Sequence, residues 1–260
     1  MQLSYFNLKD KVSIITDAAG LLGQEHCKAL HNAGCKVVAI DINYKNLKKL
    51  NEKIDCDIYE CDITNKSKIL YLKNKILKKY KKVDILINNA AIDYPIKKKN
   101  KKITFENFSI NQLGKEIKVG INGALLMSQI FGSVMVKNRK GVIINIASDL
   151  SVIAPDQKIY SHLKLFKPVS YSIIKHGIIG LTKYLASYWG KYNVRVNALS
   201  PGGVKNKQDK IFQKKIKNLI PLNRMATLDE YHGALIFLCS DSSKYLNGHN
   251  LVIDGGRSII

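Results

Sequence analysis

The chain of 260 residues has few cysteines: its five form no CxxC pair, and its six histidines show no HExxH spacing. This argues against a disulfide framework and a metal site, whereas reduced thiols are typical of cytosolic proteins. No apolar run approaches the roughly 18–20 residues of a membrane-spanning helix. Residues 1–11 lack the basic start and apolar stretch of a secretory signal. We therefore expect a cytoplasmic protein with no membrane partner and no metal.

Arginine and acidic residues are also scarce. The 42 basic residues outnumber the 20 acidic ones and give a formal net charge of +22, but only four of them are arginine. Nucleic-acid binders usually present arginine prominently, with basic and aromatic residues interleaved on one face. Here the lysines are spread along the whole chain, with two short runs at residues 78–82 and 97–102. We therefore expect a solvated basic surface and no nucleic-acid partner.

Internal repeats and Gly/Ser linkers are missing as well, and the 46% hydrophobic content is typical of a globular domain. Short β-branched runs lie at residues 12–15, 37–40, 83–87, 142–146, 194–199 and 251–253. Because these runs are nearly continuous and do not alternate with polar residues, they indicate strands buried on both faces of a parallel sheet. Apolar stripes of helical period fall between them, at residues 117–135, 174–189 and 231–238.

Strand–helix alternation from end to end predicts one α/β domain over residues 1–260. Its architecture would be a single doubly wound parallel sheet, a Rossmann fold, with helices on both faces. Two segments fit the alternation less well, residues 149–170 and 203–227. Both follow the carboxyl ends of predicted strands, where open α/β sheets bind ligands, so we interpret them as substrate loops.

A turn of small residues follows the first predicted strand, over residues 16–23. Gly20 and Gly23 would let the backbone turn sharply close to a phosphate, and the next helix offers free amides to the anion. Asp41 ends the second predicted strand, eighteen residues after Gly23. A carboxylate there hydrogen-bonds ribose hydroxyls and repels a 2′-phosphate, which favours NAD over NADP, although Lys45 could soften this preference.

Three further residues could manage a proton. Tyr171 and Lys175 are four residues apart and would share one face of a helix. A lysine ammonium near a phenol lowers the phenol pKa from about 10, so Tyr171 could exchange a proton near neutral pH. Ser148 follows the predicted strand at residues 142–146 and could hold a substrate oxygen from the other side. Taken alone, the Tyr–Lys spacing fits a surface pair equally well.

Together with Asn-Asn-Ala-Ala at residues 88–91 and the closing stretch 247–256, these motifs resemble the short-chain dehydrogenase/reductase family. The resemblance covers about residues 8–257, and the motifs occur in the family's order. Within the family, the turn, the Asn-Asn-Ala-Ala sequence and Ala-Pro-Asp-Gln at 154–157 look like a bacterial subgroup. That subgroup is associated with surface-polysaccharide or flagellin-glycan modification.

The resemblance implies an NAD-dependent oxidoreductase for a secondary alcohol or ketone, in which the cofactor carries the hydride. Tyr171 would exchange the proton, Lys175 would lower the Tyr171 pKa and bind the nicotinamide ribose, and Ser148 would orient the substrate oxygen. The residues that would hold the cofactor are Thr16, Gly20, Leu22, Gly23, Asp41, Asp62, Ile63, Asn89, Ala90, Tyr171, Lys175, Pro201, Gly202 and Val204. Helices near 115–137 and 171–189 commonly pair across subunits in this family, which implies a homotetramer or homodimer.

Two positions depart from the family's pattern. Asp17 stands where a glycine follows the threonine, and a carboxylate about 4 Å from a pyrophosphate would cost up to ~4 kcal/mol at an effective dielectric of about 20. The cost would fall if Asp17 turned to solvent or capped the helix. Gly120 stands in place of the family's catalytic asparagine, and Asn122, two residues later, points about 200° round the helix. We expect Gly120 to preserve a local helix distortion but to reduce the rate.

The sequence leaves the substrate open. Basic residues in the two substrate loops are Lys158, Lys164, Lys167, Lys205, Lys207 and Arg224. They could attract an anionic sugar derivative, although lysine is abundant everywhere in this chain. One alternative is a 3-oxoacyl-carrier-protein reductase, whose acidic carrier would suit a basic surface, but Asp41 argues against the NADPH that such reductases generally use. A second is a catalytically impaired binding or assembly protein, which the two departures motivate and the intact Ser, Tyr and Lys oppose.

Overall fold

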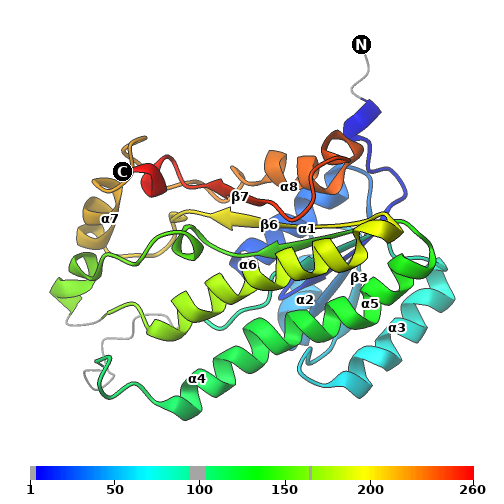
Figure 1. The fold of residues 1–260 in the computed structure, drawn as a ribbon, viewed down its shortest axis with the longest axis horizontal. Coiled ribbons are helices and arrows are strands. Elements are labelled where there is room, and N and C mark those ends of the chain that lie inside the picture. Colours follow the sequence, from blue (N-terminus) through cyan, green and yellow to red (C-terminus); the bar gives the residue numbers. More distant parts are fainter. Residues whose placement is uncertain (1–3, 94–103, 164–165) are drawn as a thin grey trace.

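The computed structural model describes residues 4–93, 104–163 and 166–260. Within these ranges, seven parallel strands form one sheet in the order β3-β2-β1-β4-β5-β6-β7. Figure 1 shows β7 beside β6, with which it pairs at one edge of the sheet. The strands are β1 (Val12–Thr16), β2 (Lys36–Asp41), β3 (Asp57–Glu60), β4 (Ile85–Asn88), β5 (Gly141–Ile146), β6 (Val194–Pro201) and β7 (Asn250–Ile253). The doubly wound parallel sheet predicted from the continuous apolar runs is therefore confirmed.

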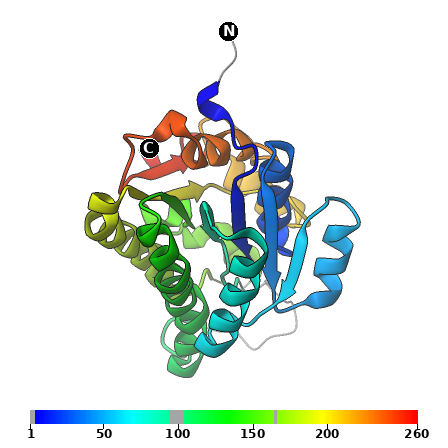
Figure 2. The ribbon, with the colours of Figure 1, turned by 90° about the vertical axis from the view of Figure 1, so that its right-hand side faces the viewer.

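Helices cover both faces of the sheet (Figure 2). The α-helices of the described ranges are α1 (Leu21–Asn32), α2 (Tyr44–Asn51), α3 (Lys66–Tyr80), α4 (Ile110–Ile117), α5 (Ala124–Lys137), α6 (Val169–Trp189), α7 (Lys210–Lys217) and α8 (His232–Cys239). One buried apolar cluster joins α1, α2 and α8 to one face, and a second joins α3, α5 and α6 to the other. Neighbouring strand residues such as Ile14 and Ile15 belong to opposite clusters, which explains why the strands carry no polar alternation.

The strand order reverses at β1. The chain moves outward through β2 and β3 and then returns to the other side of β1 to form β4. The helix after β1 packs on one face of the sheet and α5, which precedes β5, packs on the other. Open α/β sheets bind ligands in the crevice that such a reversal leaves at the carboxyl ends of the strands. The predicted cofactor turn lies at this edge.

One long helical segment, Ile110–Lys137, comprises α4, a π-helical turn at Lys118–Gly123, and α5. By its length and by the mean hydropathy of 1.5 of its most apolar window, this segment could cross a membrane, but half of that window is buried inside the molecule. Because α5 packs against α3, β4 and β5, it is a core helix of this fold.

The two predicted substrate loops are partly helical and contact each other. Residues 149–170 contain 3-10 turns at Asp149–Ser151 and Gln157–Leu163, and residues 203–227 contain α7. Phe212 and Ile216 of α7 share a small buried cluster with Ile159 and Tyr160 of the first loop. The lysine run at 97–102 and Lys164 lie outside the described residues.

Candidate active site

A hydrogen-bonded junction joins the loops that follow β1 and β4. The Thr16 hydroxyl accepts the backbone N–H groups of Asn89 (3.0 Å) and Ala90 (3.1 Å), and it donates to the Ile87 carbonyl (3.3 Å). The Asn89 side-chain amide donates back to the Thr16 carbonyl at 3.2 Å. Three residues predicted to hold the cofactor, Thr16, Asn89 and Ala90, therefore lie together.

The turn after Thr16 has no room for side chains at two positions. A Cβ at Gly23 would lie 1.9 Å from the Asp17 carbonyl oxygen, and one at Gly20 would meet the Asp17 carboxylate. No side chain caps the N-terminus of α1, which begins at Leu21. The first amides of α1 are thus open to an anion, and Leu22 lies among them. In backbone shape, this turn fits the pyrophosphate of a dinucleotide.

Asp17 keeps its carboxylate inside this turn. Its φ of 50° is left-handed, a conformation that Asp adopts more readily than most residues, and its side chain lies over Gly20. The Asn89 amide donates to Asp17 Oδ2 at 3.3 Å. Burial and the nearby Asp41 raise the pKa of Asp17 to about 7, while Lys175 acts in the opposite direction. The side chain therefore neither turns to solvent nor caps α1. Either arrangement would have reduced the electrostatic repulsion between the Asp17 carboxylate and a bound pyrophosphate.

Asp41 ends β2, as predicted, and its side chain is turned toward the same loop. Its Oδ2 accepts the Ala19 amide at 3.0 Å and its Oδ1 accepts the Asn43 amide at 2.8 Å. Asp62 and Ile63 follow β3 at the same edge of the sheet. A backbone hydrogen bond from Thr64 lowers the pKa of Asp62.

Ser148, Tyr171 and Lys175, the catalytic trio proposed from the sequence, meet between the end of β5 and α6. Tyr171 lies close enough to Ser148 for that side chain to act on the Tyr171 pKa, and Lys175 Nζ donates to the buried Ile146 carbonyl at 2.9 Å. Burial lowers the pKa of Lys175 to about 8. Burial also raises the pKa of Tyr171, and the Ser148 side chain offsets only part of this. The lowered Tyr171 pKa expected from the Tyr–Lys spacing is thus wrong for this structure, because desolvation of the phenolate dominates.

A second lysine lies against the trio. Lys167 Nζ is 3.7 Å from the centroid of the Tyr171 ring, and it pairs with Asp93 Oδ1 at 2.9 Å. A cation over an aromatic face is attracted by the ring and favours negative charge nearby. Sequence reasoning placed Lys167 only among the loop lysines, since Asp93 lies 74 residues earlier in the chain.

A buried ion pair lies behind Ser148. The Ser148 hydroxyl donates to Asp149 Oδ1 at 2.8 Å, and Arg257 Nη1 donates to Asp149 Oδ2 at 2.7 Å. The Asp149 and Arg257 side chains are only 4% and 7% exposed. Sequence reasoning missed both residues, and the adjacency of Asp149 to Ser148 was the sole available signal. The pair holds the loop after β5 to the 3-10 turn Arg257–Ile259.

The expected helix distortion is present at Gly120. The π-helical turn Lys118–Gly123 contains it, and Asn122 is exposed, so Asn122 does not replace a side chain at position 120. A Cβ at Gly120 would lie 2.6 Å from Ile174 Cγ2. Ile174 of α6 therefore occupies the room that a side chain at position 120 would need.

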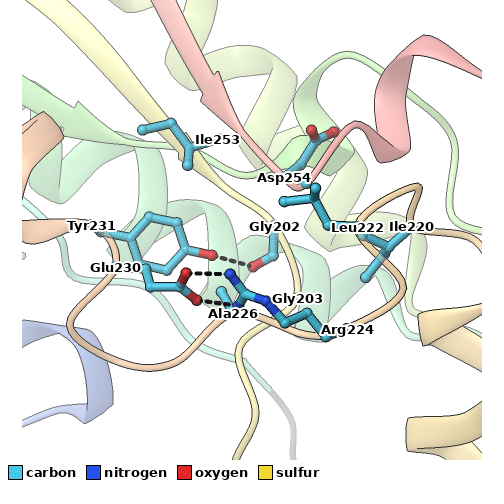
Figure 3. Close-up of a pocket in the computed structure, with 11 residues that line it drawn as sticks. Gly202, Gly203, Ile220, Leu222, Arg224, Ala226, Glu230, Tyr231, Ile253 and Asp254 are labelled. Carbon is cyan, nitrogen blue, oxygen red and sulfur yellow. Dashed lines mark hydrogen bonds and ion pairs between the residues drawn. The ribbon is translucent and has the colours of Figure 1, made fainter.

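Pro201 ends β6, and the next residues border a separate small cavity of about 110 Å³ (Figure 3). Gly202 lines it, the Tyr231 hydroxyl donates to the Gly202 carbonyl at 3.3 Å, and Arg224 forms a two-pronged ion pair with Glu230. None of the catalytic trio lines this cavity. Val204 forms an isolated bridge with Ala226, which ties the start of the second substrate loop to its end.

The described ranges contain neither a disulfide nor a candidate metal cluster. The five cysteines are free and buried, and burial raises the pKa of the Cys35 thiol to about 12. Within residues 4–93, 104–163 and 166–260, no group of three His, Cys, Asp or Glu side chains could hold a metal ion.

Comparisons with known proteins cover nearly the whole chain. A family model described as enoyl-(acyl carrier protein) reductase matches residues 18–258. Post-translational flagellin modification protein A of Campylobacter coli is 32% identical over 96% of this chain and 98% of its own length. An NAD-dependent glycerol dehydrogenase of Listeria innocua is 32% identical over 98% of this chain and 96% of its own. The crystal structure of a short-chain dehydrogenase from Leptospira borgpetersenii with bound NAD⁺ is 30% identical, covers 99% of this chain and 96% of its own, and has a TM-score of 0.86.

Proposed function

Because this chain belongs to the short-chain dehydrogenase/reductase family, we propose that it transfers hydride between a nicotinamide dinucleotide and a secondary alcohol or ketone. The observation that carries the proposal is the meeting of Ser148, Tyr171 and Lys175 at the carboxyl edge of the sheet. A turn with no room for a side chain at Gly20 or Gly23 lies at the same edge, and its backbone shape fits a pyrophosphate.

The three residues of the trio have separable roles. Because its pKa is raised, Tyr171 is protonated near neutral pH and can donate a proton to a carbonyl oxygen. In alcohol oxidation, the phenolate of Tyr171 must be stabilised, and the ammonium groups of Lys175 and Lys167 lie 5.6 Å and 3.7 Å from its ring centroid. Ser148 holds the substrate oxygen against Tyr171. The bound nicotinamide would supply or accept the hydride.

NAD is the proposed cofactor, with NADP disfavoured. Asp41 is fixed by two backbone amides at the end of β2, so its carboxylate cannot easily move away from a 2′-phosphate. Lys175 would hold the nicotinamide ribose, since its ammonium group keeps donors beyond its bond to Ile146. Asp62, Ile63, Asn89, Ala90, Pro201, Gly202 and Val204 remain the other proposed contacts.

The proposed substrate is a polyol or sugar derivative, and an anionic one suits the second substrate loop. An open cleft of about 810 Å³ beside α7 is lined by Lys205, Lys210, Lys214 and Lys217, and no carboxylate lines it. These cations would raise the local concentration of an anion. The same charge would suit an acidic carrier protein, so a 3-oxoacyl thioester is the competing substrate class.

We also propose a homotetramer or homodimer in the cytoplasm. The face of α6 that the fold leaves uncovered carries Tyr184 and Tyr188, which are 64% and 58% exposed and stack at 5.8 Å. Exposed aromatic pairs of this kind are enriched in interfaces between subunits.

The first test is calorimetric titration of NAD⁺ and NADP⁺ into the purified protein at pH 6. We expect NAD⁺ to bind in the micromolar range and NADP⁺ much more weakly, and we expect Asp41→Ala to remove the difference. Absorbance of the reduced nicotinamide then screens polyols, neutral sugars, sugar phosphates and an acetoacetyl thioester.

The matched control for turnover is Tyr171→Phe, which keeps the ring under Lys167 but has no phenolic proton. We expect it to lower turnover by about 10²–10⁴-fold while NAD⁺ affinity changes little. Equal turnover by the unmodified protein and Tyr171→Phe contradicts the proposed role of Tyr171. NAD⁺ binding without turnover of any substrate favours the binding or assembly protein, and no dinucleotide binding at any pH overturns the cofactor site.

A further inference from the structure

Asp17 places an acidic side chain where the proposed dinucleotide site should be neutral or positive. Its carboxylate lies over Gly20, inside the turn that leads into α1. A Cβ at Gly23 would meet the Asp17 carbonyl oxygen, so the backbone of Asp17 is packed against the start of α1. The backbone of Asp17 is therefore held in place, and in this arrangement its carboxylate lies inside the turn.

The neighbours of Asp17 provide few hydrogen bonds and little positive charge to stabilise its carboxylate. The Asn89 side-chain amide has two N–H donors but serves three oxygens, namely the Thr16 carbonyl, the Asp17 carbonyl and Asp17 Oδ2, at 3.2, 3.2 and 3.3 Å. From β2, Asp41 adds a second negative charge, and from α6, Lys175 adds a positive one. Lys175 donates one hydrogen bond to the Ile146 carbonyl, and among the described residues no ion pair joins Lys175 to Asp17.

A dinucleotide would bring further negative charge into this turn. Its pyrophosphate would lie against the amides at the start of α1, next to the Asp17 side chain. Anionic charge beside a partly buried carboxylate favours the protonated form of that carboxylate. The pKa of Asp17 is already about 7 before any such charge is added, so protonation at neutral pH costs little.

We propose that Asp17 binds the dinucleotide as a neutral carboxylic acid, donating its O–H to an oxygen of the dinucleotide, so that binding takes up one proton. This inference rests on the proposed function at the same site. The proton comes from solvent, and no covalent bond forms or breaks. Asp17 thus acts as a hydrogen-bond donor at a position where the family's glycine offers none.

The coupling sets the size of the pH effect. If only the protonated form binds and its pKa is about 7 in the free protein, the apparent Kd is inversely proportional to the protonated fraction of Asp17. Between pH 6 and pH 8.5 that is roughly 30-fold, with nearly tenfold per unit above pH 8. Without such coupling, NAD⁺ affinity should change little over this range.

The test is NAD⁺ titration by calorimetry between pH 6 and 8.5, in two buffers of different ionisation enthalpy. The unmodified protein should bind NAD⁺ about 30-fold more weakly at pH 8.5 than at pH 6, and should take up close to one proton at pH 8. Asp17→Asn is the matched variant, because asparagine keeps the size and tolerates the left-handed backbone but cannot titrate. It should bind with a nearly flat pH profile and take up no proton.

Lys175 serves as an internal control, since its pKa of about 8 lies in the same range and it is present in both proteins. A slope caused by Lys175 would persist in Asp17→Asn and would overturn the inference, as would a flat profile in the unmodified protein. These outcomes leave the proposed function intact. If neither protein binds NAD⁺ at any pH, the dinucleotide site itself fails and this inference fails with it.

Discussion

At the scale of single residues, the Asp149–Arg257 pair controls the environment of Ser148. Both side chains are buried, and Asp149 accepts the Ser148 hydroxyl as well as the guanidinium. Replacing Arg257 by Met would leave Asp149 buried and unpaired. We expect Arg257→Met to lower the unfolding free energy by about 3–5 kcal/mol, measured by urea denaturation at pH 7.

Two controls isolate the charge effect. The double variant Asp149→Asn with Arg257→Met removes both charges, so it should lose less stability than Arg257→Met alone. Arg224→Met breaks a pair with Glu230 that is 52% and 34% exposed, and its effect should be much smaller. Equal losses for Arg257→Met and the double variant would contradict the role of the buried pair.

At the residue scale, the sequence predicts a contact where a motif has fixed spacing, as for Lys175, whose ammonium lies 5.6 Å from the Tyr171 ring centroid. Four residues separate Tyr171 from Lys175 on one helix, so their common face follows from the sequence alone. The ion pair of Asp149 with Arg257 spans 108 residues, and the contact of Lys167 with the Tyr171 ring depends on how a loop folds back. Such contacts arise from tertiary packing, which no local pattern encodes.

At the scale of elements, the π-helical turn packs against α6 through a contact between Gly120 and the Ile174 side chain. Gly120 leaves room for Ile174, whose Cγ2 would lie 2.6 Å from a Cβ at position 120. We expect Gly120→Asn to lower the unfolding free energy by about 1–3 kcal/mol in urea denaturation, because the added side chain overpacks this contact.

Gly114 of α4 provides the matched control, because it is exposed and a Cβ there meets nothing within 4 Å. Gly114→Asn should be neutral or slightly stabilising, since asparagine is the better helix former of the two. Adding Ile174→Ala to Gly120→Asn should recover part of the loss. A Gly120→Asn loss no larger than that of Gly114→Asn would show that Ile174 yields freely.

Strands and helices that bury apolar residues were easier to predict from the sequence than short or partly exposed ones. Six of the seven strands in the described ranges stand out as apolar runs, because the sheet is covered on both faces. The edge strand β3 is only partly buried and carries Asp57 and Glu60, so it gave no such run. The helix α7 was not predicted within the second substrate loop: it is eight residues long and buries only Phe212 and Ile216, against Ile159 and Tyr160 of the other loop. A short helix that depends on a distant partner leaves a weak periodic signal.

At the scale of the whole molecule, the exposed tyrosines of α6 should decide the state of assembly. We expect the unmodified protein to elute as a dimer or tetramer in size-exclusion chromatography with light scattering. Tyr184→Lys with Tyr188→Lys should lower the measured mass, because it places two cations in an apolar interface. Tyr71→Lys on α3, where the side chain is 63% exposed, should leave the mass unchanged.

A monomeric unmodified protein would contradict the assembly proposal, and an unchanged mass in the α6 variant would show that the interface lies on another surface.

The fold class and the sheet edge that holds the site were predictable from the sequence, since strand–helix alternation defines both. Assembly could be expected only by resemblance to the family. The exposed faces of helices follow from packing, and lysine is too common in this chain for charge to reveal a contact surface.

The fit of Ile174 against Gly120 also limits the paths by which this sequence can change. An asparagine introduced at position 120 first meets a filled space, whereas a small residue introduced at position 174 first leaves a void next to Lys175. Each single replacement is therefore expected to lower the free energy of unfolding by more than the two replacements made together. The two positions form one unit for protein engineering, and a variant that is to carry an asparagine at position 120 needs a smaller residue at position 174 as well.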